Sequence, residues 1–177
     1  GIPAGKVSVI YRGVDAERFK PSAARPPRPF IVASCGALGE RKGTYDLIRG
    51  WRRLALPDSQ LWLIGSIPKG EEAAMRELAD PSIRFFGFRK DLPELMAQAH
   101  AHVLLSRNEG FAKVLLEAAA CGVVNVCTEQ TGLPADAPGS IVIADRRDDA
   151  EVGTALRSLH ADPQHLQSLG QAARAWV

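Results

Sequence analysis

The most constraining feature of the sequence is an alternation of short apolar runs with longer amphipathic stretches. Phe30–Cys35 is an apolar run without polar alternation, which is typical of a strand covered on both faces. Thr44–Leu54 instead carries its apolar residues at helical spacing. The alternation continues along the chain. A β-α-β-α order of such elements predicts an α/β fold, a Rossmann-like parallel sheet with helices on both faces.

The predicted elements follow one another at short intervals. Strands are expected over Val7–Ile10, Phe30–Cys35, Leu61–Ile64, Ile83–Phe86, His102–Leu105, Val123–Cys127 and Ile141–Ile143. Helices are expected over Thr44–Leu54, Glu71–Leu78, Leu92–Ala99, Lys113–Ala120, Ala150–Leu159 and Pro163–Trp176. The Pro/Ala/Arg-rich piece Pro21–Pro29 is expected to be a surface loop.

Composition narrows the class of protein. With 177 residues, 46% hydrophobic and 24% charged, the chain is an ordinary globular protein with room for one large domain. A net charge of +2 argues against a dedicated nucleic-acid binder. Cys35 and Cys127 lie in apolar runs and are expected to be buried small hydrophobes in a reducing cytosol. His100 and His102 are expected to be surface histidines at a strand end rather than a metal pair.

Ligands of parallel sheets bind at the carboxyl ends of the strands, so the loops there are the candidate sites. The loop Gly36–Gly43 sets glycines around a basic pair just before a helix. Backbone amides, the helix N-terminus and Lys42 make it a plausible phosphate site, although an ordinary glycine-rich turn would look alike. Gly65 closes the next strand, where it would let a ligand approach the backbone or simply form a turn.

The strongest loop runs from Ser106 into an alanine-rich helix and carries two carboxylates, Glu109 and Glu117. On one continuous helix they would lie ~12 Å apart and be turned by ~80°. If the helix begins near Ala112, both can face one crevice, where carboxylates suit sugar and ribose hydroxyls. The alternative is a helix cap and a solvated residue, but Glu117 lies in an apolar helix where a carboxylate needs a reason.

These motifs resemble the C-terminal domain of GT-B-fold retaining glycosyltransferases of the group 1 type, family four. The stretch from Glu109 to Ala118 is similar to the family's E-x(7)-E motif, and Arg41-Lys42-Gly43 to its K-G loop. Val9–Phe19 resembles the interdomain segment V-I-P-N-G-V-D…R-F, and Gly87–Leu95 the G-x-x-x-D-L-P-E-L stretch. The resemblance runs from about Val7 to Trp176.

The resemblance implies a single nucleotide-sugar-binding domain over residues 1–177, with 1–29 as interdomain segment and loop and 30–177 as the Rossmann-like body. Lys42 would bind the donor diphosphate, Glu117 the ribose hydroxyls, and Glu109 the transferred sugar, so that Glu109 and Lys42 carry catalysis. The implied donor-binding set is Gly36, Arg41, Lys42, Gly65, Phe88, Arg89, Glu109, Gly110, Phe111, Ala112, Lys113 and Glu117. Neither a cofactor nor a metal is expected.

The chain departs from the family pattern at three positions: Ala37 replaces a frequent arginine, Arg12 an asparagine and Ala112 a glycine or proline. The beginning Gly1-Ile2-Pro3 suggests a fragment. The acceptor site and a catalytic histidine would belong to an N-terminal domain missing from this chain, which alone should turn over little. That domain and the nucleotide-sugar are the expected partners, with no nucleic acid.

The implied reaction transfers a hexose-type sugar to a glycan or lipid-linked acceptor in bacterial surface polysaccharide synthesis. The expected place is the cytoplasm, and full-length relatives often work at the inner face of the membrane. Two alternatives stay open: a degenerate nucleotide-binding module, which Ala37 favours, and an enzyme like the sugar-nucleotide 2-epimerases. A dinucleotide oxidoreductase is disfavoured because the G-x-G-x-x-G fingerprint is absent.

Overall fold

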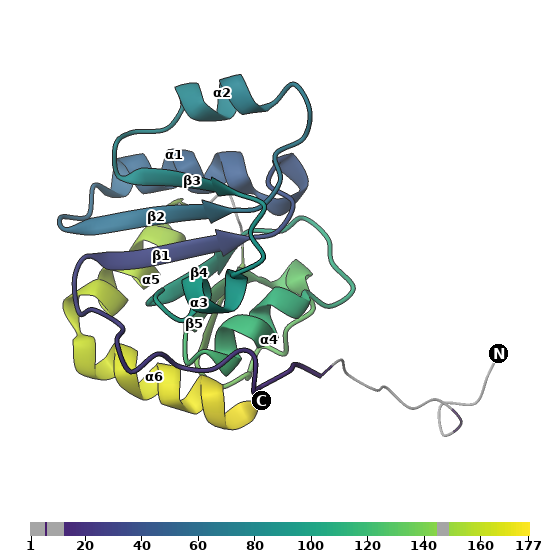
Figure 1. Cartoon of the computed structure of the whole chain (residues 1–177), viewed down its shortest axis with the longest axis vertical. Coiled ribbons are helices and arrows are strands. Elements are labelled where there is room, and N and C mark those ends of the chain that lie inside the picture. The colour runs from purple at the N-terminus through teal and green to yellow at the C-terminus, as the bar shows by residue number, and fades with distance from the viewer. Residues whose placement is uncertain (1–5, 7–12, 145–148) are drawn as a thin grey trace.

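The computed structural model of the chain describes residue 6, residues 13–144 and residues 149–177 (Figure 1). Six parallel strands form one sheet in the order β3-β2-β1-β4-β5-β6. They are β1 (Phe30–Cys35), β2 (Ser59–Ile64), β3 (Ile83–Gly87), β4 (Ala101–Leu104), β5 (Val124–Thr128) and β6 (Ser140–Ile143). The predicted Rossmann-like sheet is confirmed. The predicted strand Val7–Ile10 and the variant residue Arg12 lie outside the described residues.

Helices cover both faces of the sheet (Figure 1). They are α1 (Thr44–Leu54), α2 (Glu72–Glu77), α3 (Leu92–Met96), α4 (Lys113–Ala120), α5 (Asp149–Ala161) and α6 (Pro163–Trp176), with short 3-10 turns η2 (Glu40–Lys42) and η3 (Glu129–Thr131). Within the described residues, no helix is both long enough and apolar enough to cross a bilayer.

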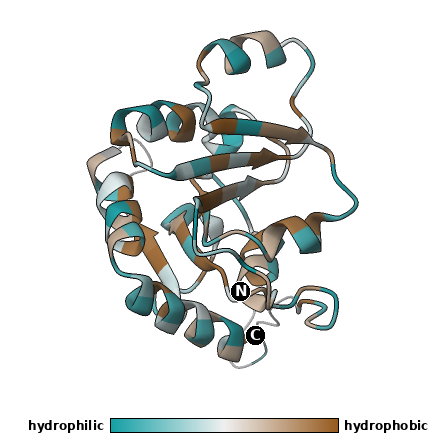
Figure 2. Ribbon diagram, turned by 60° about the vertical axis from the view of Figure 1, so that its left-hand side comes forward, coloured by the Kyte–Doolittle hydropathy of each residue, from teal (hydrophilic) through white to brown (hydrophobic). Residues whose placement is uncertain are grey.

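Strand residues divide alternately between two apolar layers, which explains the unbroken apolar runs. Phe30 and Val32 of β1 pack in the layer that holds α1 and α5, whereas Ile31, Ala33 and Cys35 pack in the layer that holds α3 and α4. Figure 2 shows the strands as mostly hydrophobic, while the helices mix hydrophobic and hydrophilic residues. The predicted burial of Cys35 and Cys127 is confirmed, and both are free thiols.

Two predictions are wrong in part: one helix is shorter than expected, and two histidines expected at the surface are buried. The expected helix Leu92–Ala99 ends at Met96, because the chain makes tight turns to enter β4: Gln98 N–H donates to Leu95 O and Ala99 N–H to Met96 O. The prediction of surface histidines is wrong for both residues, since His100 is 5% exposed and His102 is fully buried.

Both ring nitrogens of His100 have hydrogen-bond partners, whereas His102 Nε2 has none among the described residues. His100 Nδ1 accepts from the Ile31 amide at 3.0 Å, and its Nε2 lies 2.9 Å from Pro26 O. His102 Nδ1 lies 3.0 Å from Asn125 Oδ1 across the β4–β5 pair. Burial lowers the pKa of each imidazole to about 4, so both are neutral at physiological pH.

The segment 21–29 is an irregular loop, as predicted, but it is more than a surface connection. Its Arg25 reaches inward and donates to Ala97 O at 3.0 Å, Gly122 O at 3.0 Å and Cys121 O at 2.6 Å. These carbonyls follow α3 and α4, where helix ends leave acceptors without intrahelical partners. Arg25 therefore fastens this loop to the amino end of the sheet.

Candidate functional site

The order of the sheet reverses between β1 and β4, and this switch point predicts where a ligand binds. The loops that leave the carboxyl ends of β1, β2 and β3 meet there through their backbones. Gly36 N–H donates to Ile64 O at 3.0 Å, and Gly65 N–H to Gly87 O at 2.8 Å. A side chain at Gly65 would overlap Gly36 O, so packing between the loops already requires this glycine.

The K-G loop is tied to the end of β4. Gly43 has φ 69° and its missing side chain would overlap the Leu105 carbonyl, so only glycine fits here. Arg41 O accepts from Arg107 N–H at 2.9 Å and from Ser106 Oγ at 3.2 Å. The turn η2, which carries Arg41 and Lys42, is thus held directly against the loop that carries Glu109.

Glu109 is the centre of the site. Its Oε1 lies 2.7 Å from Lys42 Nζ, 2.7 Å from Arg41 Nη1 and 2.8 Å from Ser106 Oγ, which donates to it. The side chains of Glu109 and Lys42 are each 14% exposed, whereas that of Arg41 is 60% exposed. Burial alone would raise the pKa of Glu109, but the hydrogen bonds from Lys42 and Ser106 and the two positive charges outweigh it and hold the pKa below its ordinary value.

Glu117 lies one helical turn from Lys113, whose Nζ is 3.2 Å from Glu117 Oε1. The Glu117 side chain is only 12% exposed, so it does not lie on a solvated face. Burial raises the pKa of the Cys35 thiol at the end of β1, and the charge of Glu117 raises it further. The helix begins at Lys113, close to the predicted start, and leaves Glu109 in the loop.

The loop from Glu109 to Ala112 rests on η3. Glu109 N–H donates to Gln130 O at 2.8 Å and Ala112 N–H to Thr131 O at 3.0 Å. The Ala112 amide could therefore bind a ligand only by giving up its hydrogen bond to Thr131 O. Gly110 is exposed and has no atom within 4 Å of the place a side chain would occupy, and Phe111 is half-buried beside it.

Phe88 and Arg89 follow β3 at the same edge of the sheet. Phe88 is 77% exposed, the most exposed of the large hydrophobic residues described. Arg89 pairs with Asp91 through Nε–Oδ1 at 2.7 Å and Nη2–Oδ2 at 2.5 Å, and this hydrogen bonding lowers the pKa of Asp91.

Sequence reasoning missed the residues that hold the site together. Ser106 orients Glu109, and Thr128 Oγ1 holds the Ser106 carbonyl at 2.8 Å. Gly132 brings η3 close, since a side chain there would lie 2.5 Å from Gly110 O. The sequence offered one indication of the role of Ser106: this residue comes directly after a predicted strand and three residues before Glu109.

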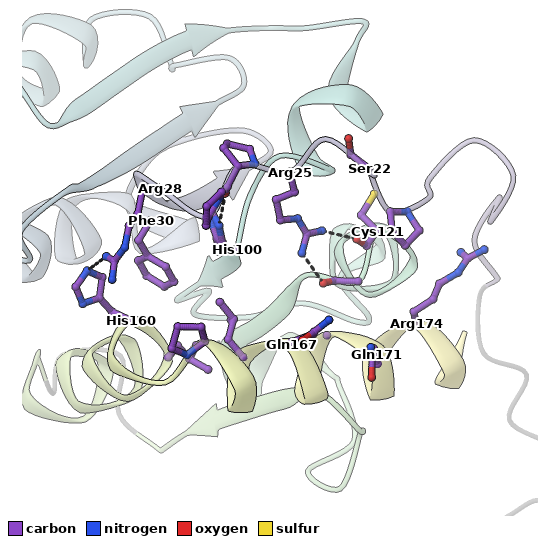
Figure 3. A pocket seen from close by; sticks show the side chains of 18 of the residues that line it. Ser22, Arg25, Arg28, Phe30, His100, Cys121, His160, Gln167, Gln171 and Arg174 are labelled. Atoms are coloured by element: carbon purple, nitrogen blue, oxygen red, sulfur yellow. Dashed lines mark hydrogen bonds between the residues drawn. The ribbon is translucent and has the colours of Figure 1, made fainter.

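A large cavity lies elsewhere, at the amino end of the sheet (Figure 3). It has a volume of about 660 Å³ and is bounded by the loop 21–29, Phe30, His100 and α6. In Figure 3, Arg25 points toward the carbonyls of Cys121 and Gly122 rather than into open space. The carboxyl end is the better candidate site because its charged side chains converge on one another.

Comparison with known proteins identifies the family of the chain. The family model for glycosyl transferases group 1 matches residues 29–162. The chain is 34% identical to glycogen synthase of Mycobacterium tuberculosis, over 96% of this chain and 43% of that protein. It is 30% identical to a GDP-mannose-dependent phosphatidylinositol monomannoside mannosyltransferase of Corynebacterium glutamicum, over 93% of this chain and 50% of that protein. The chain thus spans half or less of these relatives.

Solved structures show the same fold. The crystal structure of Anabaena HepE in complex with UDP and glucose superposes with a TM-score of 0.84 at 24% identity, over 99% of this chain and 53% of that one. A C-terminal domain of a group 1 glycosyl transferase from Francisella tularensis gives 0.83 at 22% identity, over 93% of this chain and 96% of that domain. With its GT-B-type sheet and the match of family model and relatives over most of its length, this chain belongs to the group 1 glycosyltransferases.

Proposed function

We propose that this chain is the donor-binding part of a retaining glycosyltransferase and that it binds a nucleoside diphosphate sugar at the carboxyl end of its sheet. The observation that carries the proposal is the meeting of Lys42, Arg41 and Glu109 at the switch point. Two cations there suit a diphosphate, and two carboxylates suit sugar and ribose hydroxyls. The relative in C. glutamicum is named for its dependence on GDP-mannose.

We assign the individual roles as the family resemblance implies them. Lys42 and Arg41 would contact the diphosphate. Gly36 lies next to Lys42, whose side chain passes 3.8 Å from the place of a Cβ at Gly36. A diphosphate bound to Lys42 could therefore approach the Gly36 backbone. Glu117 would accept hydrogen bonds from the ribose. Glu109, with Gly110, Phe111, Ala112 and Lys113, would hold the transferred sugar, while Phe88 and Arg89 would border the base.

In the proposed reaction, the bond from the anomeric carbon to the diphosphate breaks and its electron pair goes to the leaving oxygen. Lys42 and Arg41 would stabilise the developing charge without a metal. The acceptor hydroxyl oxygen forms the new bond on the same face of the sugar, and its proton goes to the departing diphosphate oxygen. Arg41 would supply the second cation that Ala37 does not.

The acceptor site is proposed to lie on another domain of the full-length enzyme, because holding both reactants together is what accelerates transfer. A second cavity, of about 610 Å³, lies beside Phe111 and is bounded by Val14, Pro134 and Trp176. It lies where a further domain could meet the donor site. A hexose donor and a glycan or lipid-linked acceptor fit the relatives, among them the Escherichia coli O-antigen chain mannosyltransferase B, 35% identical over 70% of this chain and 30% of that protein. We place the full-length enzyme in the cytoplasm, at the inner face of the membrane.

Calorimetric titration of the chain with UDP, GDP and ADP, each with and without an attached hexose, tests the proposal. We expect one base to bind selectively. Loss of that binding in Glu117→Ala would identify the site, whereas binding that is the same for all bases and in the variant would contradict it. Absence of binding to every nucleotide would favour a degenerate module.

A further inference from the structure

Three cationic or hydroxyl groups donate hydrogen bonds to a single carboxylate oxygen of the candidate site. Lys42 Nζ, Arg41 Nη1 and Ser106 Oγ all lie within 2.8 Å of Glu109 Oε1. Glu40, the acidic residue that directly precedes Arg41, pairs with Arg107 instead. Glu109 is therefore the counter-ion of both cations that a diphosphate would need.

A bound diphosphate and Glu109 would compete for the same positions around Lys42 and Arg41. Charge-assisted hydrogen bonds are short and directional, so an ammonium that holds Glu109 at 2.7 Å must release it or share it when phosphate oxygens arrive. The Glu109 side chain is 14% exposed, so a displaced carboxylate would not recover full hydration. It would need new donors.

We infer that Glu109 determines specificity by competing with the donor's phosphate for Lys42 and Arg41, so that the site prefers a nucleotide that carries its sugar over the bare nucleoside diphosphate. This inference rests on the proposed function. Sugar hydroxyls would donate to the displaced Glu109 and restore its hydrogen bonds. A bare diphosphate offers no such donors and leaves two negative groups side by side, which favours its release after transfer.

The test compares the chain with its Glu109→Gln variant, in which the side chain keeps its shape and can still accept from Ser106 but loses its charge. Inorganic pyrophosphate, the nucleoside diphosphate and the nucleotide-sugar are titrated by calorimetry. We expect pyrophosphate and the bare nucleotide to bind roughly tenfold more tightly, as the loss of one charge-assisted hydrogen bond implies. The preference for the nucleotide-sugar over the bare nucleotide should shrink by a similar factor. Pyrophosphate binding that is unchanged or weaker in Glu109→Gln overturns the inference.

Glu77→Gln is the matched control, since it removes one carboxylate charge at an exposed position of α2, outside the proposed donor-binding set. Its pyrophosphate affinity should stay at the wild-type value. The two proposals can fail separately: tighter pyrophosphate without nucleotide binding contradicts the donor role, whereas nucleotide binding with unchanged pyrophosphate affinity contradicts the role of Glu109.

Arg41→Gln provides a second measurement if Glu109→Gln does not fold, as judged by its melting curve. With one cation removed, Glu109 neutralises Lys42 completely, so pyrophosphate affinity should fall more than tenfold. An unchanged affinity in Arg41→Gln would equally contradict the inference.

Discussion

The two ends of the sheet both gather basic side chains but engage them in different ways. At the amino end, Arg25 donates to three backbone carbonyls, and Arg174 donates to Ala16 O, Phe19 O and Ala120 O. At the carboxyl end, Lys42 and Arg41 meet the carboxylate of Glu109. A guanidinium that donates to backbone carbonyls stabilises the fold and is not available to a ligand. A cation that pairs with a side chain can exchange that partner for a ligand. A large cavity at the amino end is therefore a weaker indication of a ligand site than the ion pairs at the carboxyl end.

Glu117→Ala should have the largest effect on ligand binding. We expect nucleotide binding to fall roughly 100-fold while the fold survives, because the variant removes the proposed ribose contact from a nearly buried position. Calorimetry with the preferred nucleotide measures the change. Glu77→Ala, at the exposed end of α2, is the control. Unchanged affinity in Glu117→Ala would remove the assigned role.

Lys42→Ala should weaken diphosphates more than nucleosides. A lost charge-assisted contact is worth about 1.5–3 kcal/mol, or roughly tenfold to 100-fold in affinity. Titrations with the nucleoside and its diphosphate measure the two losses separately. Equal losses for both ligands would show that Lys42 does not contact phosphate.

Acid should destabilise the amino end through His100. Burial, together with the nearby charge of Arg25, lowers the pKa of His100 in the fold to about 4, against 6.5 ordinarily. The unfolded chain therefore binds the proton more readily, and the free energy of unfolding should fall by up to about 3 kcal/mol as pH drops from 6.5 to 4. Urea midpoints against pH measure the slope. In His100→Asn the profile should be flatter, and an identical slope would contradict the assignment.

Arg25→Ala should destabilise the fold without changing ligand binding at the opposite end. It leaves three carbonyls without their donor, which we expect to lower the free energy of unfolding by about 2–3 kcal/mol. Urea denaturation measures this loss, and calorimetry measures affinity. A variant of full stability but weakened nucleotide binding would reverse the contrast between the two ends.

Chelation should have the smallest effect. If cationic side chains alone neutralise the diphosphate, nucleotide affinity in EDTA should equal that in magnesium or manganese within the error of the titration. Affinity that rises with added divalent cation would show that Lys42 and Arg41 are insufficient and would contradict the proposed metal independence.

The sequence predicted the fold well because strands buried on both faces and helical spacing leave direct traces in residue order. It also predicted the loop position of Glu109 and the start of α4, both of which depend on local chain chemistry. The burial of His100 and His102 escaped prediction because it depends on Ile31, Pro26 and Asn125, which are distant in sequence. The convergence of Arg41 on Glu109 escaped it for the same reason: the two residues are 68 positions apart.

The glycine contacts between loops have a consequence for protein engineering. A library that randomises the carboxyl edge should retain glycine at Gly43, Gly65 and Gly132, where another loop's backbone fills the space of a side chain. Gly110 has open space around it and a backbone conformation outside the left-handed region, so it should accept many residues. Variants with changed substrate choice would then be sought at Gly110, whereas the other three positions would be kept constant to preserve the packing between the loops.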